Sequence, residues 1–157
     1  MYFLYFIFFL VLSCNNSHID LDDKWDKAVN FRQKSKLQES ITLFKEIVEL
    51  GKNDSLVVKA QYQIADIYLN DVHDYTFAIK EFEKLIGSYP DSEHAKKSIF
   101  MLGYIHSNYI EAYTDGIDYY NMFLEKYPSD ELVHSVNYEL NLLDSLGIIE
   151  KINDLRD

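Results

Sequence analysis

The chain has 157 residues, with 15 lysines and arginines against 26 aspartates and glutamates, and its formal net charge is −11. This acidity, without any run of Lys or Arg, argues against nucleic acid as a partner, because affinity for phosphates comes largely from basic side chains. With 5 Gly and 2 Pro beside 13 Tyr and 10 Phe, the composition favours one helical domain over a disordered chain or an all-β fold.

Residues 1–13 are predicted to be a cleaved signal peptide. Residues 2–13 carry no charge, and as a helix they would rise about 18 Å, which is well short of the roughly 30 Å hydrocarbon layer. Val11-Leu12-Ser13 precedes the single cysteine, Cys14, and resembles the lipobox of bacterial lipoproteins. The resemblance implies that Cys14 becomes a lipidated first residue, that residues 14–21 form a tether, and that the protein faces the periplasm from a membrane, with Asn15 implying the outer one. The alternative is an ordinary signal or anchor with an incidental cysteine.

The rest of the chain repeats itself every 38 positions. The matching pairs include Ala65 and Gly103, Tyr75 and Tyr113, Ala78 and Gly116, Ile79 and Ile117, Phe82 and Tyr120, and Tyr89-Pro90 and Tyr127-Pro128. Ser40, Ile41 and Phe44 extend the pattern backwards, and Tyr138 and Leu140 extend it forwards. A fixed period of this length indicates a repeat architecture of about three and a half units.

Each unit is predicted to fold as two amphipathic helices. Apolar residues recur at three- and four-residue steps within 56–69 and again within 77–86, on either side of a break at Asp71–Asp74. Pro90 and Pro128 end two units, and Asp91 or Ser92, like Ser129 or Asp130, is placed to cap the helix that follows.

These residues resemble the tetratricopeptide repeat, which has a small residue in helix A and an Ala, an aromatic and a Pro in and after helix B. The matching positions are Ala65, Ala78, Phe82, Leu85 and Pro90 in one unit and Gly103, Gly116, Tyr120, Phe123 and Pro128 in the next. The resemblance implies an all-α, right-handed solenoid over residues 22–146, with units at about 22–53, 54–91 and 92–129, a capping helix at 130–146, and a short helix or tail at 147–157. The motif from Tyr89 to Gly103 is similar to repeats of BamD-type outer-membrane assembly lipoproteins and of the CpoB C-terminal domain.

Such arrays bind partners along the face lined by the A helices. The aromatic residues expected there are Trp25, Tyr62, Phe100, Tyr104 and Tyr138, and the polar ones are Lys59, Lys97, Asn70 and Asn108. The rings either form a groove for apolar side chains of a peptide or pack one repeat against the next. The asparagines either bond a peptide backbone or cap the ends of their helices. The acidic side chains are interpreted mainly as a solvated surface.

No catalytic, metal or cofactor site is predicted. The five histidines lack the spacing of a helical metal site, and His106, at the repeat position of Tyr68, is interpreted as a substitute aromatic. The sequence therefore favours a scaffold that holds other envelope proteins, with a role in outer-membrane protein assembly or envelope coordination. The alternatives are a self-associating structural spacer, as a homo-oligomer, and a peptidoglycan-binding module whose rings stack on sugars.

Overall fold

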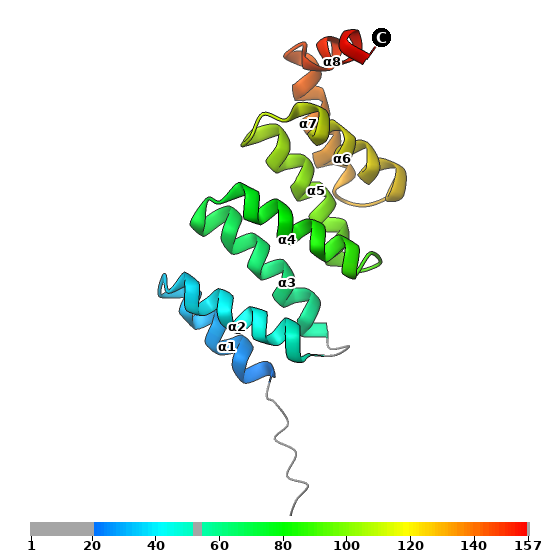
Figure 1. Ribbon diagram of the computed structural model, residues 1–157. Coiled ribbons are helices and arrows are strands. Elements are labelled where there is room, and N and C mark those ends of the chain that lie inside the picture. The colour runs from blue at the N-terminus through cyan, green and yellow to red at the C-terminus, as the bar shows by residue number, and fades with distance from the viewer. Residues whose placement is uncertain (1–20, 52–54, 157) are drawn as a thin grey trace, which may run out of the picture.

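The computed structural model describes residues 21–51 and 55–156, and this part of the chain is all-α, with no strand, as predicted. Helices lie side by side along a row, with α1 at one end and α8 at the other (Figure 1). Their bounds are α1 Leu21–Gln33, α2 Leu37–Leu50, α3 Ser55–Ile67, a π-helical turn η1 Tyr68–Val72, α4 Tyr75–Ser88, α5 Glu93–Asn108, α6 Tyr113–Lys126, α7 Val133–Ser145 and α8 Ile148–Arg156.

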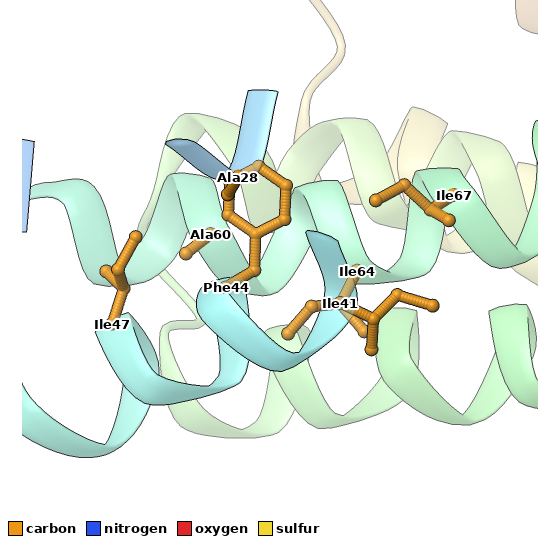
Figure 2. Close-up of a cluster of buried hydrophobic side chains, with 7 residues drawn as sticks. All are labelled: Ala28, Ile41, Phe44, Ile47, Ala60, Ile64 and Ile67. Atoms are coloured by element: carbon orange, nitrogen blue, oxygen red, sulfur yellow. The ribbon is translucent and has the colours of Figure 1, made fainter. Parts of the chain in front are cut away.

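The core runs along this row as three apolar clusters. The first is made by Ala28, Ile41, Phe44, Ile47, Ala60, Ile64 and Ile67 from α1, α2 and α3 (Figure 2). The second joins α3, η1, α4 and α5, and the third joins α5, α6 and α7. Each cluster takes residues from one helix pair and from the helix that follows it, so each pair relies on its successor to cover its apolar face. Full burial of such a side chain contributes about 1.5–3 kcal/mol.

The turn between the two helices of each pair repeats in the backbone as well as in the sequence. Ser35, His73 and Glu111 are spaced 38 residues apart, and all three have positive φ, at 56°, 59° and 55°. These are the only non-glycine residues with positive φ in the described ranges. A left-handed residue just after a helix ends it by turning the chain back across its last carbonyls. The turns of the three helix pairs therefore share a left-handed residue at the same repeat position.

An extra residue distinguishes the later pairs from the first. Ala28 and Ser40 are twelve positions apart, whereas the equivalent Ala65 and Ala78 are thirteen apart. In the second pair the π-helical turn Tyr68–Val72 absorbs this residue. The break expected at Asp71–Asp74 is consequently shorter, because helical structure continues to Val72.

Backbone hydrogen bonds show the same accommodation in the third pair. Asp74 N–H donates to the Tyr68 carbonyl at 2.8 Å, and Ala112 N–H donates to the His106 carbonyl, also at 2.8 Å. The corresponding bond in the first pair, from Lys36 N–H to a carbonyl only five residues earlier, measures 2.9 Å. The second and third turns thus close over one more residue than the first.

The small residues of the third pair stand where α5 and α6 come closest. A Cβ added at Gly103 would lie 2.6 Å from the ring of Tyr120, and one at Gly116 would lie 2.1 Å from Ser107 Oγ. Both gaps are too short for a side-chain carbon. A side chain at Gly103 would clash with the Tyr120 ring, and one at Gly116 would require the Ser107 hydroxyl to move, so the close approach of the two helices favours glycine at both positions.

The helix starts after the two prolines differ. Ser92 Oγ accepts the Ala95 N–H at 3.0 Å and caps α5, which confirms one of the two predicted caps. After Pro128, Asp130 instead accepts the Leu132 N–H at 2.9 Å, and α7 begins only at Val133 without a side-chain cap. The expected cap at Ser129 or Asp130 is therefore wrong, because a turn separates these residues from the helix.

Candidate partner-binding surface

We call the face of α1, α3, α5 and α7 that carries Trp25, Tyr62, Phe100, Tyr104 and Tyr138 the A-helix surface. These helices are the first members of their pairs, and Trp25, Tyr62, Phe100 and Tyr138 occupy one repeat position, at steps of 37, 38 and 38 residues. Since i and i+4 share a helix face, Tyr104 lies on the same side of α5 as Phe100.

Three of the rings pack edge-on or tilted against an aromatic residue of the second helix in their own pair. The ring centroids of Trp25 and Phe44 are 5.2 Å apart, and those of Tyr62 and Phe82 are 5.5 Å apart. Phe100 lies 6.1 Å from the ring of the fully buried Tyr120. All three first-helix rings are half-buried. They help to hold each pair together and offer only their outer edges to a partner.

Tyr138 differs because it is exposed and has no ring contact among the described residues. Its side chain is 67 % exposed, the highest value among the large apolar residues of the described chain. Leu142, one turn further along the same side of α7, is 41 % exposed, and Leu146, which follows the end of the helix, is 60 % exposed. The α7 part of the A-helix surface therefore presents an open apolar stripe.

Tyr104 belongs to a line of rings that crosses from α5 to α4. It lies 6.4 Å from Phe100 in a stacked arrangement and 5.7 Å from Tyr109 edge-on. Tyr109 in turn stacks on Tyr75 at 4.6 Å. Burial, followed by the hydroxyl of Tyr109 and the charge of Glu139, raises the pKa of Tyr104. The phenol therefore stays protonated over the physiological range.

The two predicted lysines lie near the beginnings of their helices. Lys59 on α3 and Lys97 on α5 are exposed, and both contribute, after burial, to lowering the pKa of His94. His94 lies 5.2 Å from the ring of Tyr62. A small positive region therefore lies on the A-helix surface near the N-terminal ends of α3 and α5.

The two predicted asparagines, Asn70 and Asn108, are exposed and bond differently. Asn70 donates to the Asp66 carboxylate at 2.8 Å. Asn108 donates to the Tyr104 carbonyl at 3.2 Å, as a residue closing a helix end does, and also to Glu139 Oε2 on α7 at 3.1 Å. Of the two, Asn108 therefore links successive first helices.

A charged network that the sequence analysis missed lies near the C-terminal ends of α1 and α3. Arg32 of α1 donates from Nη2 to Asp66 at 2.6 Å and from Nε to Asp71 at 2.7 Å, and from Nη1 to Gln63 Oε1 at 2.8 Å. The Arg32 and Asp66 side chains are only 23 % exposed. Comparing each first helix with the next at the repeat spacing would have placed the arginine beside these carboxylates.

His106 occupies an aromatic position without hydrogen bonds. Its side chain is 12 % exposed, its ring lies 5.5 Å from that of Tyr119, and neither ring nitrogen has a hydrogen-bond partner within the described residues. Asp115 Oδ2 lies 3.7 Å from Nδ1, beyond hydrogen-bond distance. The histidine packs as a ring, in agreement with its interpretation as a substitute aromatic.

Two further features bear on the kind of site present. Across residues 21–51 and 55–156, no three His, Cys, Asp or Glu side chains gather closely enough to hold a metal ion. Over the same ranges, no helix combines the length and the apolar composition needed to cross a membrane. Cys14, the predicted lipidation site, lies outside the described residues.

No protein-family model matches the chain, and no curated protein matches it significantly.

Proposed function

We propose that the chain is a tetratricopeptide-type solenoid that binds segments of other envelope proteins along its A-helix surface, and that a lipid on Cys14 anchors it to a membrane facing the periplasm. The observation that carries this proposal is the exposed ring of Tyr138, which continues the line of half-buried rings Phe100 and Tyr104 onto α7. Exposed aromatic anchors commonly dominate the affinity of protein interfaces.

The repeat geometry supports the tetratricopeptide assignment. Three helix pairs share a left-handed turn residue at 38-residue steps, and Gly103 and Gly116 stand at a close approach of α5 and α6, where this repeat family has small residues. Solenoids of this kind use long surfaces rather than enclosed pockets to bind extended or helical segments. The proposal therefore gives the protein a scaffolding role and no catalytic step.

The test is crosslinking in cells followed by affinity purification of the full chain from detergent-solubilised membranes. Tyr138→Ala removes the exposed ring, and Met122→Ala, which changes a 45 % exposed residue on α6, is the matched control. We expect wild type and Met122→Ala to recover a partner that Tyr138→Ala loses. A β-barrel assembly protein would indicate outer-membrane biogenesis, and a Tol or cell-wall protein would indicate envelope coordination. Equal recovery by all three proteins would contradict the proposal.

The self-associating spacer is the second candidate, because Leu142 and Leu146 extend the exposed stripe beyond Tyr138. In that case the stripe would be covered by a second copy. Light scattering would then show a mass that rises with protein concentration and that Tyr138→Ala reduces to the monomer value, while the purification would recover only the chain itself.

Lipidation is tested separately. Replacing Cys14 by alanine removes the only thiol of the chain, so we expect the protein to move from the membrane pellet to the soluble fraction. Ser17→Ala, within the predicted tether, is the control. Unchanged pelleting of the Cys14→Ala protein would overturn the lipid anchor.

A further inference from the structure

Glu139 lies within the A-helix surface and has no cation near it. Its half-buried carboxylate accepts the amide of Asn108 at 3.1 Å, and among the side chains that the structure describes no Lys, Arg or His comes within ion-pair distance of it. The equivalent position on α3 is Gln63, which bonds Arg32. A carboxylate on α7, bonded to Asn108, thus takes the place of the neutral amide on α3 that bonds Arg32.

The surroundings of Glu139 suit a positive charge. Its bond to Asn108 places it next to the last turns of α5, where Tyr104 also lies, and its charge contributes to raising the pKa of Tyr104. Tyr138 is its neighbour in sequence on α7 and is 67 % exposed. Aromatic faces and a carboxylate together attract a lysine or arginine side chain through cation–π and ionic interactions.

The positive region of the surface, around Lys59 and Lys97, lies near the N-terminal ends of α3 and α5, away from Glu139. Lys97 is eleven residues before Asn108 on α5, which is about 16 Å along the helix axis. Repulsion between Lys97 and a cation bound at Glu139 is weakened by salt over that distance, because the Debye length is about 8 Å at physiological ionic strength. The surface therefore carries lysines near the N-terminal ends of α3 and α5 and the carboxylate of Glu139 near the C-terminal end of α5.

We infer that the segment bound on the A-helix surface carries a lysine or arginine beside its apolar anchors, and that Glu139 receives this cation while Tyr104 contacts its stem and Tyr138 contacts the neighbouring apolar side chains. This inference rests on the proposed function and adds the chemistry of the partner. It makes Glu139 the specificity-determining residue of the surface and sets the direction in which a segment lies.

The test uses an array of 12-residue peptides in which Leu or Phe occupies two positions three or four apart, with Arg, Gln or Glu at each remaining position in turn. The labelled full chain is applied at low salt and at physiological salt. We expect Arg peptides to bind roughly three- to fivefold better than their Gln counterparts, as for a partly exposed ion pair, and Glu peptides to bind worst. The preference should weaken as salt is added.

Two variants identify the residue responsible. Glu139→Gln keeps an oxygen that accepts the Asn108 amide, so the fold is retained, and the Arg-over-Gln ratio should fall to about one. Glu49→Gln, an exposed carboxylate on α2, removes the same charge elsewhere and should leave the ratio unchanged. Tyr138→Ala should weaken all peptides alike.

The outcomes separate the inference from the proposed function. If Arg, Gln and Glu peptides bind wild type equally and Tyr138→Ala weakens them all, the surface binds peptides and the assignment of Glu139 is overturned. If the preference survives in Glu139→Gln, the cation is received elsewhere and the inference fails. If no peptide binds wild type above the Tyr138→Ala background, both the inference and the proposed function are contradicted.

Discussion

The two ends of the A-helix surface use the same repeat positions for different tasks. At the first junction between helix pairs, where α1 meets α3, Trp25 packs on Phe44, and Arg32 neutralises two carboxylates of the next pair. At the last junction, Tyr138 has no ring beneath it, and Glu139 has only the Asn108 amide. The comparison teaches that a repeat position does not fix a role, because the side chains of the neighbouring helices decide whether a residue is used internally or remains open.

The largest expected difference between the two ends is the loss of stability when the equivalent rings, Trp25 and Tyr138, are each replaced by alanine. Trp25→Ala leaves a gap beside Phe44, and we expect a loss of about 2–4 kcal/mol in the free energy of unfolding. Tyr138→Ala removes an exposed ring and should change it by less than about 0.5 kcal/mol. Urea unfolding followed by circular dichroism measures both. Similar losses for the two variants would contradict the contrast between the two ends.

Breaking the charged network is expected to have the next largest effect. Arg32→Gln leaves Asp66 and Asp71 without their cation in partly buried positions, and we expect a loss of about 1–2 kcal/mol in unfolding free energy. Arg32→Lys keeps the charge but not the planar fork, so it should lie between wild type and Arg32→Gln. An Arg32→Gln protein as stable as wild type would show that the first junction does not depend on the network.

The comparison can also be sharpened by making the last junction resemble the first. Asn108→Arg places a guanidinium beside Glu139, which should add up to about 1 kcal/mol of stability. The same change occupies the carboxylate, so the preference for Arg peptides on the array should disappear. A variant that is stabilised yet keeps the full preference would separate Glu139 from partner recognition.

The smallest effect is expected from acid at the Lys96–Asp130 pair. Lys96 Nζ lies 2.5 Å from Asp130 Oδ2 and ties α5 to the turn before α7. Lys96, and then the Leu132 N–H, lower the pKa of Asp130 below its ordinary 3.8. Because the folded-state pKa is depressed, this stabilisation is present above pH 3.8 and is lost as the pH falls through the lower value.

Asp130→Asn removes this pH-dependent contribution. The variant should be less stable than wild type at neutral pH, and the difference should shrink as the solution is acidified below pH 3.8. Thermal unfolding across a pH series measures it. A difference that stays constant down to the acid limit would show that the pair does not contribute through ionisation.

The helices and their pairing were predictable because they depend on local patterns. Apolar spacing and the 38-residue period locate α3 to α6, and the small residues correctly mark the approach of α5 to α6. The π-helical turn was not predicted, since one inserted residue can be absorbed either in a loop or in a helix. The position of the insertion was nevertheless visible in the sequence.

The candidate site was less predictable. Spacing placed Trp25, Tyr62 and Phe100 on one face, but their burial depends on rings about twenty residues away in the second helices. The Arg32 network and the isolation of Glu139 depend on how successive pairs sit against each other, which periodicity within one helix does not encode. The exposure of Tyr138 depends on which side chains the neighbouring helices place beside it, and the repeat spacing does not encode that.

The most direct test of the central claim, that the α7 end of the A-helix surface is where partners bind, is photo-crosslinking in cells. A benzophenone amino acid replaces Tyr138 in one protein and Met122, on the exposed side of α6, in another. The account predicts an adduct with another protein from position 138 and none from position 122. Adducts from position 122 alone, or from neither position, would contradict it.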